Sequence, residues 1–492
     1  MSDIMLKIPC AGHRARGPLV AAVLAAATFL AGCAVGPEFT PPRPSLPSQW
    51  RTTAPAATVA SAQTIPASTA WWKAFGDPVL DDLEARAGAG NLDVDLAAER
   101  VSAARIARGA VRAQSAPLVA GQAGYSRDRA STADVATVAR EVLGLAAEPN
   151  LPKAVGFDLY TVGAGASWEL DLWGGKARQR EGAAASLDAA RAQARGALLA
   201  VQAEAARAYF QLRGLQAEHA LRQEALALAS DRAAIVQVSR ERGLTAGAEA
   251  VDAQSRVRSL RQELTGLEQD QASLARALAI LVGGDPGQDP FDLAAPAPAV
   301  SLAPGPVRLP SDMARQRPDI VAAEAQLHAA TAMIGAAKAD LYPQISLTGQ
   351  LSIDVTSLDN FGWGERNTSI GPSISLPLFS GGRLERVVDL RRSEERSAAI
   401  VYRQTVINAW REVEDALGQI RALQDQGQEA EADLAAWRGK AAMIEQRHAR
   451  GDIARAAVLS VQEGVVAAEL VAVRQHTAAV LARVQLRRAL GG

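Results

Sequence analysis

Residues 97–117, AAERVSAARIARGAVRAQSAP, and residues 323–343, AEAQLHAATAMIGAAKADLYP, are two copies of one pattern at an offset of 226. Further along the chain, Leu-Trp-Gly-Gly at 172–175 matches Leu-Phe-Ser-Gly at 378–381 at an offset of 206. An internal repeat constrains the architecture more strongly than any local feature. Because the offset falls by 20, the first copy carries about 20 additional residues between 118 and 171.

Alternating apolar and polar residues follow each copy of this pattern. Isoleucine and leucine alternate with serine, threonine and glutamine over 344–354, a period of two that is typical of a strand with one apolar face. The same alternation predicts strands at about 118–128, 159–172 and 368–378. Four strands cannot close a barrel and would leave two exposed edges, which oligomerisation would remove.

Heptad-like spacing of apolar residues predicts long helices after each pair of strands. We expect one helical hairpin over 175–282 and another over 381–490. At the rise of an α-helix, the stretch from Gly175 to Gly243 would be on the order of 100 Å long, which exceeds any globular core. The predicted seam positions are Leu187, Ala194, Leu198, Val201, Ala205, Ala208, Leu212, Leu215, Val257, Leu260, Leu264, Leu267, Gln271, Leu274, Leu278, Leu281, Tyr402, Val406, Trp410, Val413, Leu417 and Ile420.

Both hairpins are predicted to bend at a glycine flanked by charges. Arg242-Gly243-Leu244 marks the first bend, and Arg450-Gly451-Asp452 marks the second at an offset of 208. One interpretation is a solvated turn with a glycine C-cap. The other is a docking tip for another helical hairpin, and the pattern alone leaves both open.

The N-terminus has the pattern of a secreted lipoprotein. A basic start is followed by an apolar run over 19–31, which is too short to span a bilayer, and then by Leu30-Ala31-Gly32-Cys33, which resembles the bacterial lipobox. We expect residues 1–32 to be removed and Cys33 to carry lipid, although an ordinary signal peptide with an incidental cysteine gives a similar pattern. Two or more acyl chains give stable attachment. Ala34 follows the cysteine, where an aspartate would suggest inner-membrane retention, so outer-membrane sorting is implied.

Composition argues against catalysis and nucleic-acid binding. The net charge is −1, so no basic surface for nucleic acid is expected. The two cysteines give no disulfide framework, and no histidine pair has metal-ligand spacing, so His328 and the other helix histidines are interpreted as ordinary helix residues. Because no catalytic or phosphate-binding motif is present, we expect no enzyme activity and no cofactor other than lipid on Cys33.

The predicted organisation therefore has a removable signal and two repeats. A lipidated, Pro-rich leader covers 33–70 and repeat one covers 71–284. A Pro-rich connector at 285–312 separates it from repeat two at 313–492. The expected fold class is an α+β membrane protein, with long coiled-coil hairpins and four strands per chain.

These features together resemble the outer-membrane factor family of TolC/OprM-like exit ducts, in particular its NodT-type lipoprotein branch. The resemblance covers residues 33–492. The matching stretches are Leu30–Cys33, WWKAFGDPVLDDL from Trp71, WELDLWG from Trp168, RPDI from Arg317, LPLFSGG from Leu376 and the two glycine tips.

The resemblance implies a homotrimer with a 12-stranded β-barrel in the lipid of the outer membrane and a periplasmic α-barrel about 100 Å long. A periplasmic adaptor would dock at the helical tips, and an inner-membrane transporter would supply the energy. Substrates such as drugs would cross a water-filled lumen unchanged, so the expected function is the exit duct of a tripartite efflux pump.

The family also implies an acidic aperture. Its acids often lie six and nine residues beyond the second tip glycine, where this chain has Ala457 and Ser460. The equivalent positions of repeat one hold Glu249 and Asp252. We hypothesise that these two acids, or Asp452, give the aperture its anionic character and attract cations.

Two alternatives share parts of this pattern. A periplasmic adaptor lipoprotein would have one hairpin and inner-membrane sorting, and the two repeated hairpins and Ala34 argue against it. A duct for type I protein secretion is not excluded by the strand pattern. The lipobox and the segment from Trp71 favour the drug-efflux branch.

Overall fold

The computed structural model describes residues 34–43, 47, 49–52, 70–132, 152, 154–285 and 315–492. The signal 1–32, Cys33, most of the leader and nearly all of the connector lie outside the described residues. The chain forms two compact units. The strand unit comprises 1–40, 106–185 and 328–397, and the helix unit comprises 41–105, 186–327 and 398–492.

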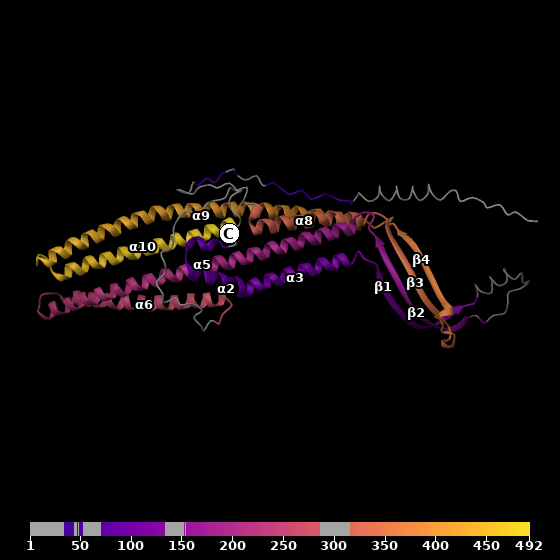
Figure 1. The fold of residues 1–492 in the computed structure, drawn as a ribbon, viewed down its shortest axis with the longest axis horizontal. Coiled ribbons are helices and arrows are strands. Elements are labelled where there is room, and N and C mark those ends of the chain that lie inside the picture. Colours follow the sequence, from indigo (N-terminus) through magenta and orange to yellow (C-terminus); the bar gives the residue numbers. More distant parts are fainter. Residues whose placement is uncertain are drawn as a thin grey trace, which may run out of the picture. The chain divides into compact units, whose positions relative to one another are not determined.

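The strand unit contains one antiparallel sheet in the order β1-β2-β3-β4 within the described residues (Figure 1). β1 (Leu118–Ser131) pairs with β2 (Ala154–Leu170), and β3 (Gln344–Val355) pairs with β4 (Arg366–Ser375). The β2–β3 ladder joins the two repeats, so β1 and β4 are the edges of the described sheet. The prediction of four strands in two hairpins is confirmed.

The strand bounds differ from those expected. β2 begins at Ala154 instead of 159 because the ladder with β1 continues to Ser131, three residues beyond the expected end of that strand. β4 runs from Arg366 to Ser375 instead of 368–378. Pro377 lies just past its end and cannot donate a backbone hydrogen bond to a neighbouring strand.

The helices of the two repeats match in length. α3 (Leu92–Ala113) and α8 (Pro318–Ala339) have 22 residues each, and α5 (Gly175–Glu241) and α9 (Arg383–Ala449) have 67 each. The returning helices α6 (Gly247–Leu281) and α10 (Arg455–Leu490) have 35 and 36 residues. The internal repeat and the two helical hairpins are therefore confirmed.

The second hairpin begins two residues later than expected. Gly381 and Gly382 have φ angles of +61° and +79°, which lie outside the right-handed helical region. Such angles cost glycine little but strain other residues. α9 consequently begins at Arg383 instead of 381.

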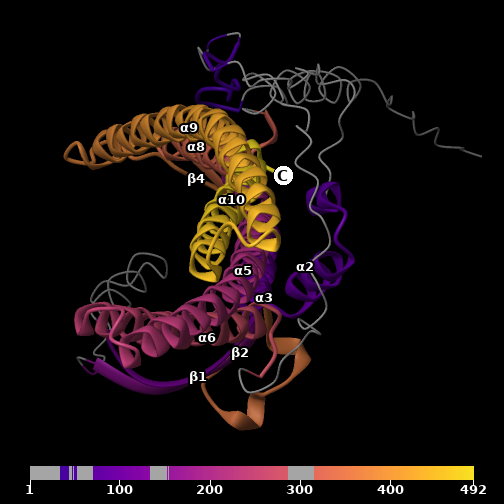
Figure 2. The ribbon, with the colours of Figure 1, turned by 90° about the vertical axis from the view of Figure 1, so that its left-hand side faces the viewer.

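Apolar seams hold the helix unit together. One core joins α5, α6 and α10 through Val257, Leu260, Val466 and neighbouring alanines. Figure 2 shows the ribbons of these three helices. Small alanines in this seam allow the helices to approach closely. The predicted seam positions that are buried are Leu187, Val201, Ala205, Ala208, Leu212, Val257, Leu260, Leu264, Leu278, Tyr402, Val406, Val413, Leu417 and Ile420. The other predicted seam positions are half-buried.

The aromatic segment before the first repeat also belongs to the core of the helix unit. Trp71, Trp72 and Phe75 form a short helix, η1 (Trp71–Phe75), and are buried against α5, α6 and α10. Gly76 ends this helix with a φ of +70°, and α2 (Pro78–Gly90) follows. The cluster of aromatics therefore attaches this segment to the helices.

Candidate functional site

The first helical bend is a Schellman turn. Gly243 has a φ of +72°, and its N–H donates to the carbonyl of Arg240 at 2.9 Å. The N–H of Leu244 donates to the carbonyl of Ser239 at 2.9 Å. These two bonds satisfy carbonyls that the helix end would leave open. The side chain of Leu244 is 75% exposed, so the bend presents an apolar residue to solvent.

The second bend has the same hydrogen bonds. Gly451 has a φ of +84° and donates to the carbonyl of His448 at 2.8 Å, while Asp452 donates to that of Arg447 at 3.0 Å. His448 Nδ1 also lies 2.7 Å from the carbonyl oxygen of Ile453. Arg242, Gly243, Arg450, Gly451 and Asp452 are all exposed, so both bends present a charged, accessible tip.

The candidate aperture acids lie close to these bends. Glu249 and Asp252 are exposed on the first turns of α6 and line a groove of about 380 Å³. Arg232 and Arg256 line the same groove, so the two carboxylates face cations as well as solvent. Arg232 also forms a 2.9 Å ion pair with Glu463 of α10, which joins the two hairpins.

The equivalent positions of α10, 457 and 460, hold no carboxylate. Ala457 is half-buried, whereas Ser460 is exposed. Glu463 lies one turn further along α10 and reaches the groove that contains Glu249 and Asp252. Glu463 is not predicted by the sequence pattern, because the positions counted from the tip glycine do not reach it.

The chain immediately after Cys33 packs closely against Gly174 and Gly335, and we call this contact surface the glycine seat. The N–H of Val35 donates to the carbonyl of Trp173 at 3.0 Å. Gly174 has a φ of +74°, and a Cβ there would lie 2.6 Å from the Cβ of Ala34. At Gly335 of α8, a Cβ would lie 2.7 Å from the carbonyl oxygen of Val35. The leader therefore occupies space that a side chain at Gly174 or Gly335 would fill.

A cluster of aromatic and charged side chains continues this seat. Phe39 stacks on His328 with ring centroids 4.4 Å apart, and His328 Nε2 lies 2.8 Å from Glu181. Arg178 donates to the same carboxylate at 2.7 Å. Burial would raise the pKa of Glu181, but hydrogen bonds from Arg178 and His328 outweigh it and hold that pKa below its usual range. His328 is thus a packed helix residue with a defined partner.

The leader has a second attachment within the helix unit. The N–H groups of Arg51 and Thr52 donate to the two oxygens of Glu414 at 2.6 and 3.2 Å. The guanidinium of Arg51 lies over Trp410, 5.8 Å from its ring centroid. These contacts attach the leader to α9.

Arg317 joins α8 to the end of the chain. Its Nη1 donates to the carbonyl of Ala489 at 2.7 Å, and its Nη2 contacts Asp319 at 2.7 Å and Glu412 at 2.8 Å. Arg317 is itself 7% exposed. Since planar guanidinium groups bind several oxygens at once, this residue fastens α8, α9 and α10 together.

The strand register separates the sheet into two faces. Tyr160, Val162, Trp168 and Leu170 of β2 share one face with Leu347, Leu351 and Ile353 of β3. The other face carries mostly Gly, Ser, Thr and Gln. An apolar face opposite a face of small polar residues is the pattern of a membrane-spanning barrel with an aqueous interior.

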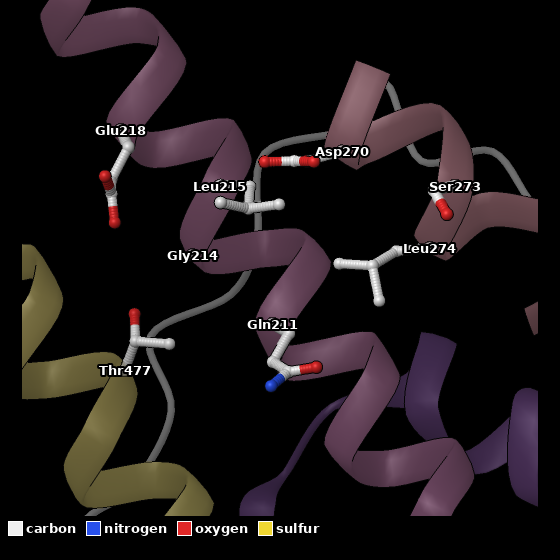
Figure 3. A pocket seen from close by; sticks show the side chains of 8 residues that line it. All are labelled: Gln211, Gly214, Leu215, Glu218, Asp270, Ser273, Leu274 and Thr477. Atoms are coloured by element: carbon white, nitrogen blue, oxygen red, sulfur yellow. The ribbon is translucent and has the colours of Figure 1, made fainter. Parts of the chain in front are cut away.

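A polar groove lies where α5, α6 and α10 meet (Figure 3). It has a volume of about 370 Å³. Gly214 permits the close approach, because a Cβ there would lie 2.7 Å from the side chain of Thr477. Glu218 at the edge of the groove is paired with Arg474 at 2.8 Å. No cluster of three metal-ligating side chains occurs in the part of the chain that the structure describes.

These features define an outer-membrane channel protein with periplasmic helical hairpins. The family model described as "Outer membrane efflux protein" matches residues 84–284 and 309–492. The chain therefore belongs to the outer membrane efflux protein family, in its NodT-type branch, and functions as the outer-membrane exit duct of an efflux system. Members of this family are channel proteins.

Relatives support this assignment along most of the chain. Nodulation protein T of Rhizobium leguminosarum bv. viciae is 30% identical over 409 residues, which is 82% of this chain and 78% of that protein. The probable efflux pump outer membrane protein TtgC of Pseudomonas putida is 29% identical over 472 residues, or 95% and 94% of the two chains. The solved outer-membrane channel OprN has a TM-score of 0.80 at 27% identity and covers 94% of this chain and 99% of that one.

Proposed function

We propose that three copies of this chain close a barrel and that the trimer is the exit duct of a tripartite pump. The main support for this proposal is that the sheet has two open edges. β1 and β4 each have one unpaired side in the described sheet, and such edges are a liability unless another strand covers them. Pairing β4 of one copy with β1 of the next gives twelve strands, enough for an aqueous lumen.

The apolar face of the sheet would contact lipid and the polar face would line the lumen. Acylation of Cys33 would add a second attachment, because the glycine seat holds Ala34 beside Gly174, close to the end of β2. Substrates would pass unchanged. We therefore propose that the protein is not an enzyme and has no cofactor other than its lipid.

The exposed residues at the two helical bends indicate which proteins the duct would bind. Arg242, Leu244, Arg450 and Asp452 are exposed at two bends with the same backbone turn. Such a pair suits the helical hairpin of a periplasmic adaptor, which would connect the duct to an inner-membrane transporter. TtgC is named as a probable efflux pump outer membrane protein, which favours export of drug-like compounds over type I protein secretion.

The barrel is tested by cysteine cross-linking in the lipidated full-length protein. Val119→Cys on β1, combined in turn with Ile370→Cys or Ile374→Cys on β4, should give covalent trimers in at least one pair. Ala164→Cys on the inner strand β2 is the matched control and should give none. Monomers from every edge pair, together with a monomer mass in detergent, would overturn the trimer.

Adaptor docking is tested with a photo-activatable residue at Leu244 or Asp452 in cells that contain the complete pump. Cross-links to a hairpin-containing adaptor are expected at both tips. A probe at Glu268, on α6 and 24 residues beyond Leu244, is the control. Equally strong cross-linking of the adaptor at Glu268 would show that the tips are not its specific docking site.

A further inference from the structure

The apolar face of the sheet is bounded by aromatic residues along β1 and β2. Trp168 lies near one end, and Tyr125 and Tyr160 pair near the other, with ring centroids 5.1 Å apart. Trp168 and Tyr160 are eight residues apart, about 27 Å along a strand and about 20 Å along the membrane normal at a usual tilt. Aromatic girdles of this kind mark the two interfaces of a membrane-spanning barrel.

The residues between the two aromatic levels on this face carry no charge. Arginines appear on the same face at the far ends of the strands, away from α3 and α5. Arg127 and Arg129 follow Tyr125 at steps of two on β1, and Arg366 is the first residue of β4 and pairs with Ile353. The apolar face therefore ends in a basic border, formed by Arg127, Arg129 and Arg366.

The acids near these strand ends offset the charge of the basic border only in part. Asp128 and Asp354 lie on the polar face by register. Asp158 shares the face of Arg127 and forms a long ion pair with it, in which Arg127 Nε lies 3.9 Å from Oδ1. The same oxygen accepts a hydrogen bond from Tyr125 at 3.0 Å. The side chain of Arg127 is 77% exposed, and Arg129 and Arg366 are exposed as well.

We propose that the basic border binds the phosphate groups of the glycolipid in the outer leaflet of the outer membrane. The inference rests on the proposed barrel, in which this face meets lipid. Charges just beyond an aromatic girdle lie at headgroup depth, and guanidinium groups match phosphate oxygens with two parallel hydrogen bonds. An acidic protein partner fits less well, because it would not require all three arginines to lie on the lipid-facing side of the sheet.

The arrangement also predicts a stoichiometry. In the proposed trimer, β4 of one copy lies beside β1 of the next, so Arg366 borders the same seam as Arg127 and Arg129 of its neighbour. Three equivalent seams result. We expect up to three glycolipids per trimer, one at each seam.

The test is native mass spectrometry of the lipidated full-length protein with diphosphoryl lipid A as the probe. Lipid A without phosphates and phosphatidylglycerol are the comparison lipids. We expect up to three copies of diphosphoryl lipid A on the trimer, bound at least about tenfold more tightly than either comparison lipid. The triple variant Arg127→Gln, Arg129→Gln, Arg366→Gln should lose that preference.

A matched variant separates this effect from a change in total charge. Arg276, Arg403 and Arg421 are exposed on helices, and changing all three to glutamine should leave glycolipid binding unchanged. Wild-type affinity in the border variant, or equal binding of phosphatidylglycerol, would overturn the proposal. The same spectra report the trimer mass, so a trimer that binds no glycolipid refutes this inference alone, whereas a monomer refutes the proposed barrel.

Discussion

The hydroxyl of Tyr209 donates to Oδ2 of Asp77 at 2.6 Å, across 132 positions of sequence. Asp77 is 1% exposed, and its other oxygen accepts from the N–H of Val79 at 2.9 Å. One buried carboxylate thus caps α2 and ties it to α5. Burial and this hydrogen bond raise the pKa of Tyr209 to about 12, so the phenol remains a donor at neutral pH.

Tyr209→Phe should therefore destabilise the helix unit. The substitution leaves a buried carboxylate oxygen without its donor, which costs about 1–3 kcal/mol. We expect a Tm several degrees lower in detergent, measured by circular dichroism. Tyr402→Phe is the control, because Tyr402 is also buried and its hydroxyl makes no hydrogen bond within the described residues. Equal losses in both variants would assign the effect to packing.

Glu84 should make the stability depend on pH. Burial, and to a lesser extent Asp81, raises the pKa of Glu84 from 4.5 to about 9, and neither carboxyl oxygen has a hydrogen-bond partner within the described residues. Between these two values the folded chain holds a proton that the unfolded chain releases. This contribution to stability is complete below pH 4.5 and is lost as the pH rises toward 9.

Glu84→Gln removes this dependence. We expect its Tm to exceed that of the wild type by an amount that grows from pH 5 to pH 9, which corresponds to at least about 1 kcal/mol at the upper end. Glu99→Gln, at an exposed site on α3, should follow the wild-type profile. A constant Tm difference across the pH range would show that Glu84 does not titrate on unfolding.

Gly335→Ala should loosen the leader. The added Cβ would lie 2.7 Å from the carbonyl oxygen of Val35, so the leader has to move. We expect roughly fivefold faster cleavage after Glu38 by a glutamyl endopeptidase, since looser segments are cut more readily. Gly109 is the repeat-one equivalent, and a Cβ added there would meet nothing within 4 Å, so Gly109→Ala should leave cleavage unchanged. Equal cleavage rates in both variants would show that close packing at Gly335 does not hold the leader in place.

Glu249 and Asp252 should control cation block of the open channel. Replacing them with Gln and Asn removes two negative charges and should weaken block by a trivalent cation roughly fivefold in planar bilayers. Arg232→Gln should strengthen block, because it releases Glu463 from its ion pair. Asp270→Asn, further along α6, is the control. Unchanged block in the double variant would end the aperture hypothesis.

Much of the architecture follows from periodicity and glycine placement. The alternation over 344–354 predicts β3, and the heptad seams predict the buried faces of the long helices, because local spacing determines which side chains share a face. Gly243 and Gly451 identify the bends, since the left-handed conformation of each turn favours glycine. Strand ends were less predictable, because β2 extends as far as its partner strand allows.

The sequence by itself determined the repeat, the strand and helix order and the class of protein, and it predicts a lipoprotein signal. Only the tertiary structure decided which polar groups meet. The pairs Asp77–Tyr209 and Arg232–Glu463, and the seat of the leader against Gly174 and Gly335, join residues more than 130 positions apart. Periodicity assigns a side chain to a face, but it does not specify which side chain of another element lies opposite. That choice depends on packing and on the hydrogen bonds that buried polar groups require.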